Sequence, residues 1–158
     1  INGAAITVGC ELALACDFRI VGPKALFQES WIRLGIIPPL GGLFLLPHIV
    51  GLGMAKEMVL TGRAIDAQEA LSSGLATSAV DDAAKLMARA QAYAEELSRL
   101  PPLAYRAAKE GIHRGLESSM EKEWSANVLS QTILLGSHDF REGLASVKEK
   151  RAPSFMGR

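Results

Sequence analysis

The chain has 158 residues, of which 49% are hydrophobic and 22% charged, the proportions of an ordinary globular protein with one sizeable core. Lys plus Arg and Asp plus Glu number 17 each, so a zero net charge gives no general electrostatic reason to bind nucleic acid or an anionic membrane. No apolar run reaches the ~18 residues that span a bilayer, and the first residues lack the basic segment of a signal peptide. We therefore expect a cytoplasmic protein without nucleic-acid or membrane partners.

The residues that commonly bind metals or form disulfides are few. Cys10 and Cys16 lie in an apolar stretch, and a disulfide scaffold would need more cysteines, so we expect both to be reduced core residues. His48, His113 and His138 are scattered without the spacing of metal ligands. The sequence therefore predicts no metal site.

The first half alternates short apolar runs with Gly and Pro, which is typical of short strands and helices joined by tight turns. In chain order we expect a strand end and turn within 1–6, a buried helix over 9–16, a half-buried strand over 17–21, a strand over 25–29, a loop over 35–42, and helices over 43–50, 53–60 and 67–72. Asp66 is a good N-cap for the last of these helices, and Glu69 would complete a capping box.

The second half changes character and predicts helices alone. We expect them from Asp81 or Asp82 to about residue 100, where Pro101 and Pro102 stop the helix, and then over 103–116, 118–135 and 138–150. Their apolar residues recur at helical spacing, so each helix has a face that needs a partner, either the first half or another subunit. We place the division between two regions at 1–80 and 81–158.

An ordered series of motifs resembles the enoyl-CoA hydratase/isomerase (crotonase-like) superfamily. The resemblance begins at residues 2–17, where Asn-Gly leads through a Gly-containing corner and a helix to an Asp-initiated strand. It continues, at family spacing, through Phe27, residues 34–38, Gly41-Gly42, Leu46-Pro47, Val50-Gly51, residues 60–62, 67–70, Gly74-Leu75, 141–143 and 149–151. The series covers essentially the whole chain.

The resemblance implies an α/β fold, a partial crotonase-like ββα spiral followed by a helical C-terminal trimerisation region. The chain would be the C-terminal part of such a protein, and a missing front half would carry much of the CoA-binding surface and the first oxyanion-hole N–H. The implied partners are an acyl-CoA substrate and further copies of the chain in a homotrimer or a dimer of trimers. No cofactor is implied beyond the coenzyme A of the substrate.

The implied chemistry passes through a thioester enolate, whose oxyanion needs preorganised N–H donors at a helix N-terminus. By resemblance these donors are the backbone N–H of Val8 and, beside it, Gly9, although the Val8 side chain would narrow the site. Glu11 matches the first catalytic Glu of the hydratases and would act as general acid or base. The alternatives are a tight turn without a ligand and an exposed Glu11 favoured by the helix dipole.

The second catalytic Glu of the hydratases is replaced, because the alignment places Trp31 at that position. If the strand continues, alternation points Phe27, Glu29 and Trp31 to the same side, and Glu29 lies roughly 6–7 Å along the strand from the expected place. Chlorobenzoyl-CoA dehalogenases are similar in carrying Trp there, but their nucleophilic Asp falls at about Pro39. Trp31 is therefore expected either to wall the acyl pocket or to be a buried core residue.

Basic and aromatic residues near the end match a patch that contacts the CoA nucleotide in family members. Lys150 and Arg151 would pair with a phosphate and Phe155 would stack on adenine; the alternative is a solvated charged terminus. For Arg33, beside the expected site, we predict a salt bridge.

Together these features predict an enzyme of the lyase or isomerase type, with thioester hydrolysis as a further possibility, that acts on acyl-CoA through an enolate. With one matching carboxylate, isomerisation, hydrolysis or carbon–carbon bond chemistry is favoured over plain hydration. The alternative is a degenerate, non-catalytic CoA-thioester-binding or assembly protein of the same fold, which Trp31 and Val8 would favour.

Overall fold

The computed structural model describes residues 1–158 and divides into two compact units, residues 1–91 and 92–158. The division lies within helix α5 (Leu86–Ser98) rather than after residue 80. The roles that we assigned to the two regions, spiral core and oligomerisation, stay predictions.

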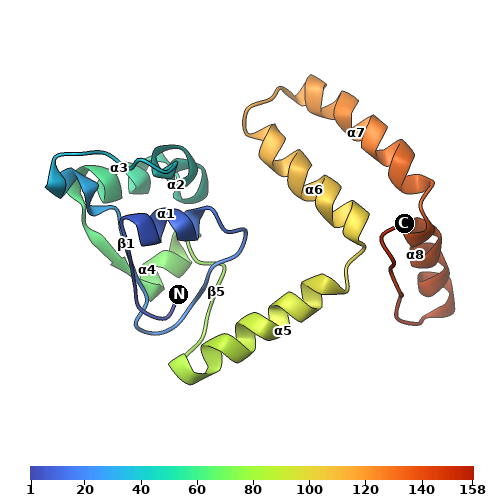
Figure 1. Ribbon diagram of the computed structural model, residues 1–158, viewed down its shortest axis with the longest axis horizontal. Helices are drawn as coiled ribbons and strands as arrows, with labels where there is room; N and C mark the ends of the chain where they lie inside the picture. The colour runs from blue at the N-terminus through green and yellow to red at the C-terminus, as the bar shows by residue number, and fades with distance from the viewer. The chain divides into compact units, whose positions relative to one another are not determined.

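The first unit contains two small sheets (Figure 1). Its three-stranded sheet has the order β1-β3-β4, in which β1 (Ala4–Ile6) is parallel and β4 (Ala64–Asp66) antiparallel to the central β3 (Leu26–Gln28). The second sheet pairs β2 (Ile20–Val21) in parallel with β5 (Ser78–Ala79). The strands predicted over 17–21 and 25–29 are thus present but shorter, whereas β4 and β5 were not predicted because each is too short to show a periodicity of its own.

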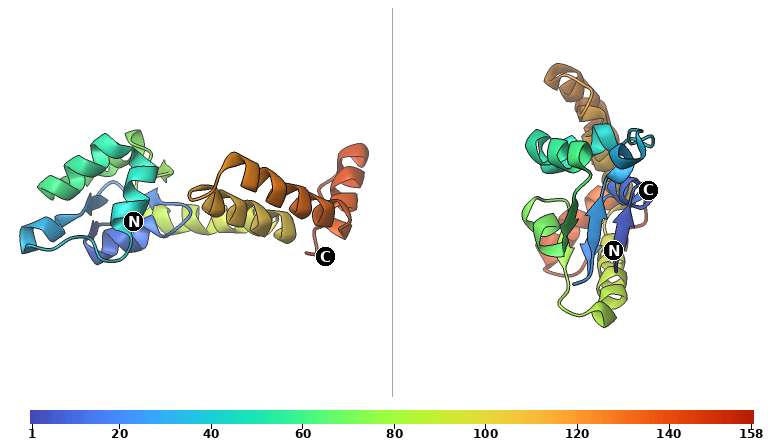
Figure 2. Two further views of the ribbon diagram at one scale, coloured as in Figure 1. Left: turned by 90° about the horizontal axis from the view of Figure 1, so that it is seen from above. Right: turned by 90° about the vertical axis from the view of Figure 1, so that its left-hand side faces the viewer.

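The helices of the first unit follow the predicted order. They are α1 (Val8–Leu14), α2 (Gly42–Val50), α3 (Leu52–Thr61) and α4 (Ala67–Ser72), with short 3₁₀ helices η1 (Ser30–Leu34) and η2 (Ala83–Lys85). Helices α2 and α3 pack against each other, as Figures 1 and 2 show. Gly62 ends α3 in the left-handed region at φ 61°, a conformation that glycine adopts without steric cost.

Phe27 lies at the centre of the core. Its position on β3 pairs with Ala5 of β1 and Ile65 of β4, and all three side chains are buried. Leu46 from α2 and Met58 from α3 belong to the same cluster. Because successive strand residues point to opposite faces, burial of Phe27 also directs Glu29 toward the interior if the chain stays extended between them.

A buried arginine closes the C-terminal end of α1. Arg19 donates to the carbonyl oxygens of Ala13, Cys16 and Leu75. A cation interacts favourably with the unpaired carbonyls at the end of a helix. Arg19 therefore fastens α1 to the segment that leads into β5.

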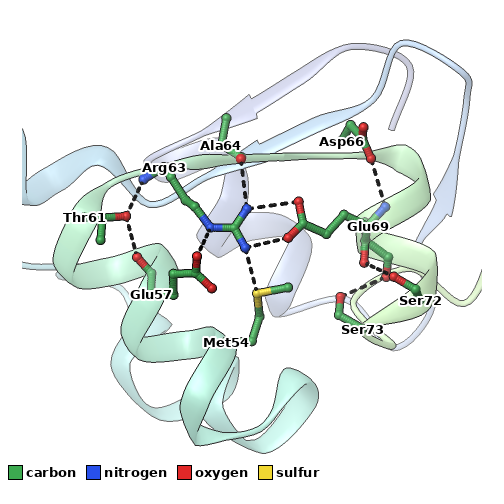
Figure 3. Close-up of polar contacts among 10 residues, drawn as sticks. Met54, Glu57, Thr61, Arg63, Ala64, Asp66, Glu69, Ser72 and Ser73 are labelled. Carbon is green, nitrogen blue, oxygen red and sulfur yellow. Dashed lines mark hydrogen bonds and ion pairs between the residues drawn. The ribbon is translucent and has the colours of Figure 1, made fainter.

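A second arginine joins three elements of the same unit (Figure 3). Arg63 pairs with Glu57 of α3 at 2.8 Å, forms two hydrogen bonds to the carboxylate of Glu69 on α4, and donates to Met54 Sδ. Asp66 accepts the Glu69 N–H at 2.8 Å, which confirms the predicted N-cap. The reciprocal half of the capping box is not formed, because the Glu69 side chain binds Arg63 instead.

The second unit contains the remaining helices, whose predicted order is confirmed. These are α6 (Pro102–Gly115), α7 (Met120–Leu135) and α8 (His138–Glu149), which follow α5. Ser119 and Ser137 cap α7 and α8 through their side chains. Helices α6 and α7 lie side by side as an antiparallel hairpin in Figures 1 and 2.

The C-terminal tail of this unit is fastened to α8 by two carboxylates. Buried Asp139 accepts the N–H groups of Met156 at 2.7 Å and Gly157 at 2.8 Å. Glu142 binds the Arg151 guanidinium through both oxygens and also accepts the Ser154 N–H. The motifs at 141–143 and 149–151 thus meet as a structural clasp.

None of the helices combines the length and the apolar character needed to cross a membrane. The side chains of His, Cys, Asp and Glu form no group of three or more that is arranged to hold a metal ion.

Candidate functional site

The N-terminus of α1 presents backbone donors at an open corner. Thr7 has φ 50° and ψ −114°, and its hydroxyl donates to the Ile6 carbonyl rather than accepting from the helix. The first-turn N–H groups of Val8 and Gly9 therefore keep no acceptor from the usual N-cap. A Cβ at Gly9 would meet nothing within 4 Å, and the Val8 side chain is 50% exposed. These donors face space that a ligand oxygen can enter.

Glu11 lies one turn further along α1, and its carboxylate is held from outside the helix. Only 2% of the residue is exposed. Its Oε2 accepts the N–H of Leu40 at 2.7 Å and of Gly42 at 2.9 Å, at the start of α2. Its Oε1 is buried and has no hydrogen-bond partner. This burial excludes the alternative in which Glu11 is an exposed residue favoured only by the helix dipole.

Gly42 makes this contact possible. A Cβ at Gly42 would lie 3.2 Å from Glu11 Cγ and 3.1 Å from Pro38 Cβ. Gly42 is therefore needed for close packing of the carboxylate against the start of α2. The arrangement fixes one oxygen of Glu11 and leaves the other available to exchange a proton.

Exposed apolar side chains lie in the segment whose backbone contacts Glu11. Ile36, Ile37 and Leu40, from the loop between η1 and α2, are each at least 50% exposed, as is Val8. Leu40 is also the residue whose N–H binds Glu11. The corner thus combines polar backbone donors and one carboxylate with an apolar rim, a composition that suits an acyl chain with a polar head.

The structure does not meet the condition under which alternation along a strand would point Phe27, Glu29 and Trp31 to the same side. Strand β3 ends at Gln28, and η1 begins at Ser30, because Glu29 leaves the extended conformation at φ −99° and ψ 70°. Trp31 lies in η1, where its residue is half-buried and its indole N–H is buried without a hydrogen-bond partner. The two-residue spacing along a strand therefore does not describe how Glu29 and Trp31 lie relative to each other.

Glu29 is completely buried, and neither of its carboxyl oxygens has a hydrogen bond of good geometry, although the Cys10 thiol and the Trp31 indole lie close enough to interact with it. Burial raises the pKa of Glu29 to about 7. The neighbouring Cys10 thiol and Trp31 indole lower this pKa, whereas the charge of Glu11 raises it. Burial likewise raises the pKa of the Cys10 thiol, and the charge of Glu29 raises it further. The interior beneath α1 therefore holds two carboxyl groups, Glu11 and Glu29, beside an un-ionised thiol.

Two further predictions in the first unit, for Cys16 and Arg33, are corrected. Cys16 lies beyond the end of α1 and is exposed, whereas Cys10 is buried; both are free thiols. Arg33 forms no salt bridge, and its side chain instead lies against Gly62, where a Cβ would be 3.1 Å from Nε. His48 is exposed, with its ring 4.5 Å from that of Phe44.

The residues expected to contact the CoA nucleotide belong to the second unit. Lys150 is exposed and ends α8 in the left-handed conformation at φ 54°. Arg151 is engaged by Glu142 and Glu149, and Phe155 is half-buried near Gly143 in a groove between the helices. The ion pairs of Arg151 leave Lys150 as the exposed cation of the predicted patch.

Inspection of the sequence alone did not reveal how deeply Glu29 is buried. A signal was present, because Glu29 follows a core phenylalanine at the two-residue spacing that keeps side chains on one face. A charged residue in that position is more often exposed, so the pattern by itself did not distinguish a buried acid from the end of a strand.

Comparison with known proteins places these features in a family. The family model described as enoyl-CoA hydratase/isomerase matches residues 1–158. The relative named "Probable enoyl-CoA hydratase 2, mitochondrial" of Arabidopsis thaliana is 40% identical over 157 residues, which cover 99% of this chain and 52% of that protein. The 2,3-dehydroadipyl-CoA hydratase of Escherichia coli K12 is 36% identical, covering 100% of this chain and 62% of the relative.

Solved structures give the same result. The crystal structure of an enoyl-CoA hydratase from Bacillus anthracis superposes with a TM-score of 0.94 at 38% sequence identity, covering 99% of this chain and 60% of that one. The chain therefore spans roughly half to three fifths of the length of such relatives. These shares give no position along the relatives, so the expectation of a C-terminal part stays a prediction.

Proposed function

From the premise that this chain belongs to the enoyl-CoA hydratase/isomerase family, we propose that the native protein transforms an acyl-CoA thioester through an enolate, with Glu11 as the group that moves the proton. One observation carries the proposal. The Glu11 carboxylate is buried with one oxygen bound by two backbone N–H groups and the other unpartnered.

In the proposed reaction the Glu11 side chain removes a proton, and backbone N–H groups stabilise the negative charge that results. Glu11 Oε1 takes the proton from the carbon next to the thioester carbonyl, and negative charge moves to the carbonyl oxygen as the enolate forms. The Val8 and Gly9 N–H groups supply hydrogen bonds to that oxygen, and such preorganised donors stabilise charge as it develops. The Leu40 and Gly42 N–H groups meanwhile keep Glu11 in one orientation.

The apolar rim supports an acyl chain rather than a polar substrate. Ile36, Ile37 and Leu40 would contact the hydrocarbon part, and Trp31 of η1 remains a proposed wall of the same pocket. Coenzyme A would enter as part of the substrate, with Lys150 as the proposed contact for one of its phosphates. The other proposed contact, stacking of adenine on Phe155, is weakened because that ring is half-buried.

The test of Glu11 is its replacement by Gln in the native full-length protein. A glutamine oxygen can still accept the Leu40 and Gly42 N–H groups, so Glu11→Gln removes the base while retaining the local hydrogen bonds. A positioned general base contributes about 10²–10⁴-fold, and we expect turnover of a short-chain 3-enoyl-CoA, which has a removable proton on its α-carbon, to fall by that factor. Glu95→Gln, at an exposed position of α5, is the matched control and should leave turnover unchanged.

Near-normal turnover by Glu11→Gln would refute the assigned role. If the wild-type protein binds enoyl-CoA but turns over none, the non-catalytic alternative is supported, since Trp31 stands where hydratases carry their second Glu. Isothermal calorimetry with the same thioester distinguishes that case from a protein that does not bind at all.

We also propose that the second unit assembles the protein into a homotrimer or a dimer of trimers. Helix α7 has no buried residue, and its apolar side chains Trp124, Val128, Leu129 and Ile133 are each more than half exposed. An uncovered apolar face of this extent is typical of an interaction surface. Sedimentation equilibrium should give a mass that is a multiple of three chains, and Val128→Glu should lower it.

A further inference from the structure

Glu29 is a buried acid to which the proposed reaction assigns no task. It lies where β3 passes into η1, and none of its surface is exposed. Both carboxyl oxygens are inside the protein without a hydrogen bond of good geometry. Native proteins leave few buried polar groups unsatisfied, so each such group calls for a physical account.

The surroundings of Glu29 contain no cation. Helix α1 contributes the Cys10 thiol and the Glu11 carboxylate, and η1 contributes the Trp31 indole. The residues of β1 and β4 that flank Phe27, Ala5 and Ile65, are apolar. No Lys, Arg or His is among the groups that shift the pKa of Glu29. A carboxylate placed there would be desolvated without a compensating charge, which favours the protonated form.

Glu11 and Glu29 differ in what binds them. Two N–H donors at the start of α2 reach Glu11 Oε2, whereas neither carboxyl oxygen of Glu29 has a hydrogen bond of good geometry. Two neighbouring carboxyl groups in a poorly solvated site resist carrying two charges. Glu29, the carboxyl group without such donors, is the one whose surroundings favour the protonated form.

We propose that Glu29 is a positioning residue that holds a proton beneath α1, next to Glu11, so that it adds no negative charge of its own to the site. The inference rests on the proposed function, since it assigns Glu29 a part in the enolate reaction. Glu29 acts through Glu11 rather than on the substrate. It thereby supplies a second carboxyl group in a protein whose family position for that group is occupied by Trp31.

The proposal has a consequence for the dependence of turnover on pH. Burial, with a further contribution from the Glu11 charge, raises the pKa of Glu29 to about 7, against the opposing effects of Cys10 and Trp31. Above this pH Glu29 itself becomes negatively charged. The enolate is itself an anion, so the additional charge beside it disfavours its formation, and kcat/KM is expected to fall as the pH rises through neutrality.

The first experiment compares pH profiles of kcat/KM for wild-type protein and Glu29→Gln, using the same short-chain enoyl-CoA. Glutamine is neutral at every pH and similar in shape to the protonated acid. We expect Glu29→Gln to keep the wild-type rate below neutral pH and to lose the alkaline limb. An unchanged alkaline limb in the variant, or a wild-type profile that is flat through neutrality, would overturn the proposal.

A second variant is expected to move the alkaline limb of the pH profile. The Trp31 indole lowers the pKa of Glu29, so Trp31→Phe should move the alkaline limb to higher pH instead of removing it. A limb that stays in place or moves to lower pH contradicts the assigned arrangement.

Infrared difference spectroscopy of the wild-type protein provides a readout that needs no turnover. A protonated carboxyl group with no strong hydrogen bond should give a carbonyl band that disappears as the pH is raised through neutrality and that is missing from Glu29→Gln. If the protein turns over no enoyl-CoA while this band titrates, the proposed function fails but Glu29 is still the proton-holding member. If no such band exists, Glu29 does not hold a proton, whatever the turnover.

Discussion

The burial of Glu29 predicts a measurable dependence of folding stability on pH. In the folded protein the pKa of Glu29 is raised from 4.5 to about 7, chiefly by burial. The folded chain therefore binds this proton more tightly than the unfolded chain, and the free energy of unfolding must fall as the pH rises. Below about pH 4.5 both states are protonated and the residue contributes no penalty.

The magnitude follows from the shift. Each unit of pKa difference corresponds to about 1.4 kcal/mol, so the penalty grows between pH 4.5 and about 7 and reaches at most about 3 to 4 kcal/mol above that range. The value is an upper limit, because water that reaches the site screens the charge. Glu29→Gln lacks the penalty, and the difference in unfolding free energy between variant and wild type should grow in its favour over this interval.

Urea unfolding at a series of pH values, at one fixed protein concentration, measures this difference. The chain has two tryptophans, so a Trp124→Phe background leaves Trp31, beside Glu29, as the fluorescent reporter of the first unit. Trp124 is 68% exposed, and its replacement should perturb that unit little. Parallel stability curves for wild type and Glu29→Gln across neutral pH would refute the reasoning, because the buried acid would then have the same proton affinity in both states.

Three further outcomes are expected. Gly42→Ala should lower turnover by displacing Glu11, since a Cβ there lies 3.2 Å from Glu11 Cγ. Gly53→Ala in α3 is the control: a Cβ there meets nothing within 4 Å, so this variant should keep its turnover and gain up to about 1 kcal/mol in folding stability. Equal turnover of the two variants would contradict the packing argument. Asp139→Asn should speed hydrogen exchange at the Met156 and Gly157 amides, which donate to that carboxylate, and unchanged protection would show that other contacts hold the tail. Binding of the Arg151 guanidinium lowers the pKa of Glu142 to about 2. The contribution of Glu142 to stability is therefore present above the ordinary pKa of a glutamate and is lost as the pH falls through the acid range. Glu142→Gln should flatten that part of the acid-unfolding curve, and an unaltered curve would argue against the clasp.

Local sequence was sufficient for much of the helical structure. Asp66, Ser119 and Ser137 cap the helices that follow them, because a side-chain cap depends on residues within one turn of each other. The start of α1 and its Glu11 were likewise evident from a short motif and its spacing. The family itself followed from an ordered series of such motifs, which the comparisons confirm.

Contacts between distant residues decided the rest. The strands β4 and β5 exist because they pair with β3 and β2, far away in the chain, and two or three residues carry no period of their own. Trp31 lies in a 3₁₀ helix because the chain turns at Glu29, so the conditional placement of Glu29 and Trp31 on one face of a strand does not hold. Arg151 and Glu142 were both visible as charges, yet only the return of the tail onto α8 made them partners.

The two carboxyl groups show the same division most clearly. The sequence by itself determined that Glu11 stands in the first turn of a helix, because that position depends only on neighbouring residues. Only the tertiary structure decided that two N–H groups of a later loop reach Glu11 while none reaches Glu29. Proton affinity depends on solvent, donors and charges gathered from separate segments, so it is a property of the folded protein and not of either residue.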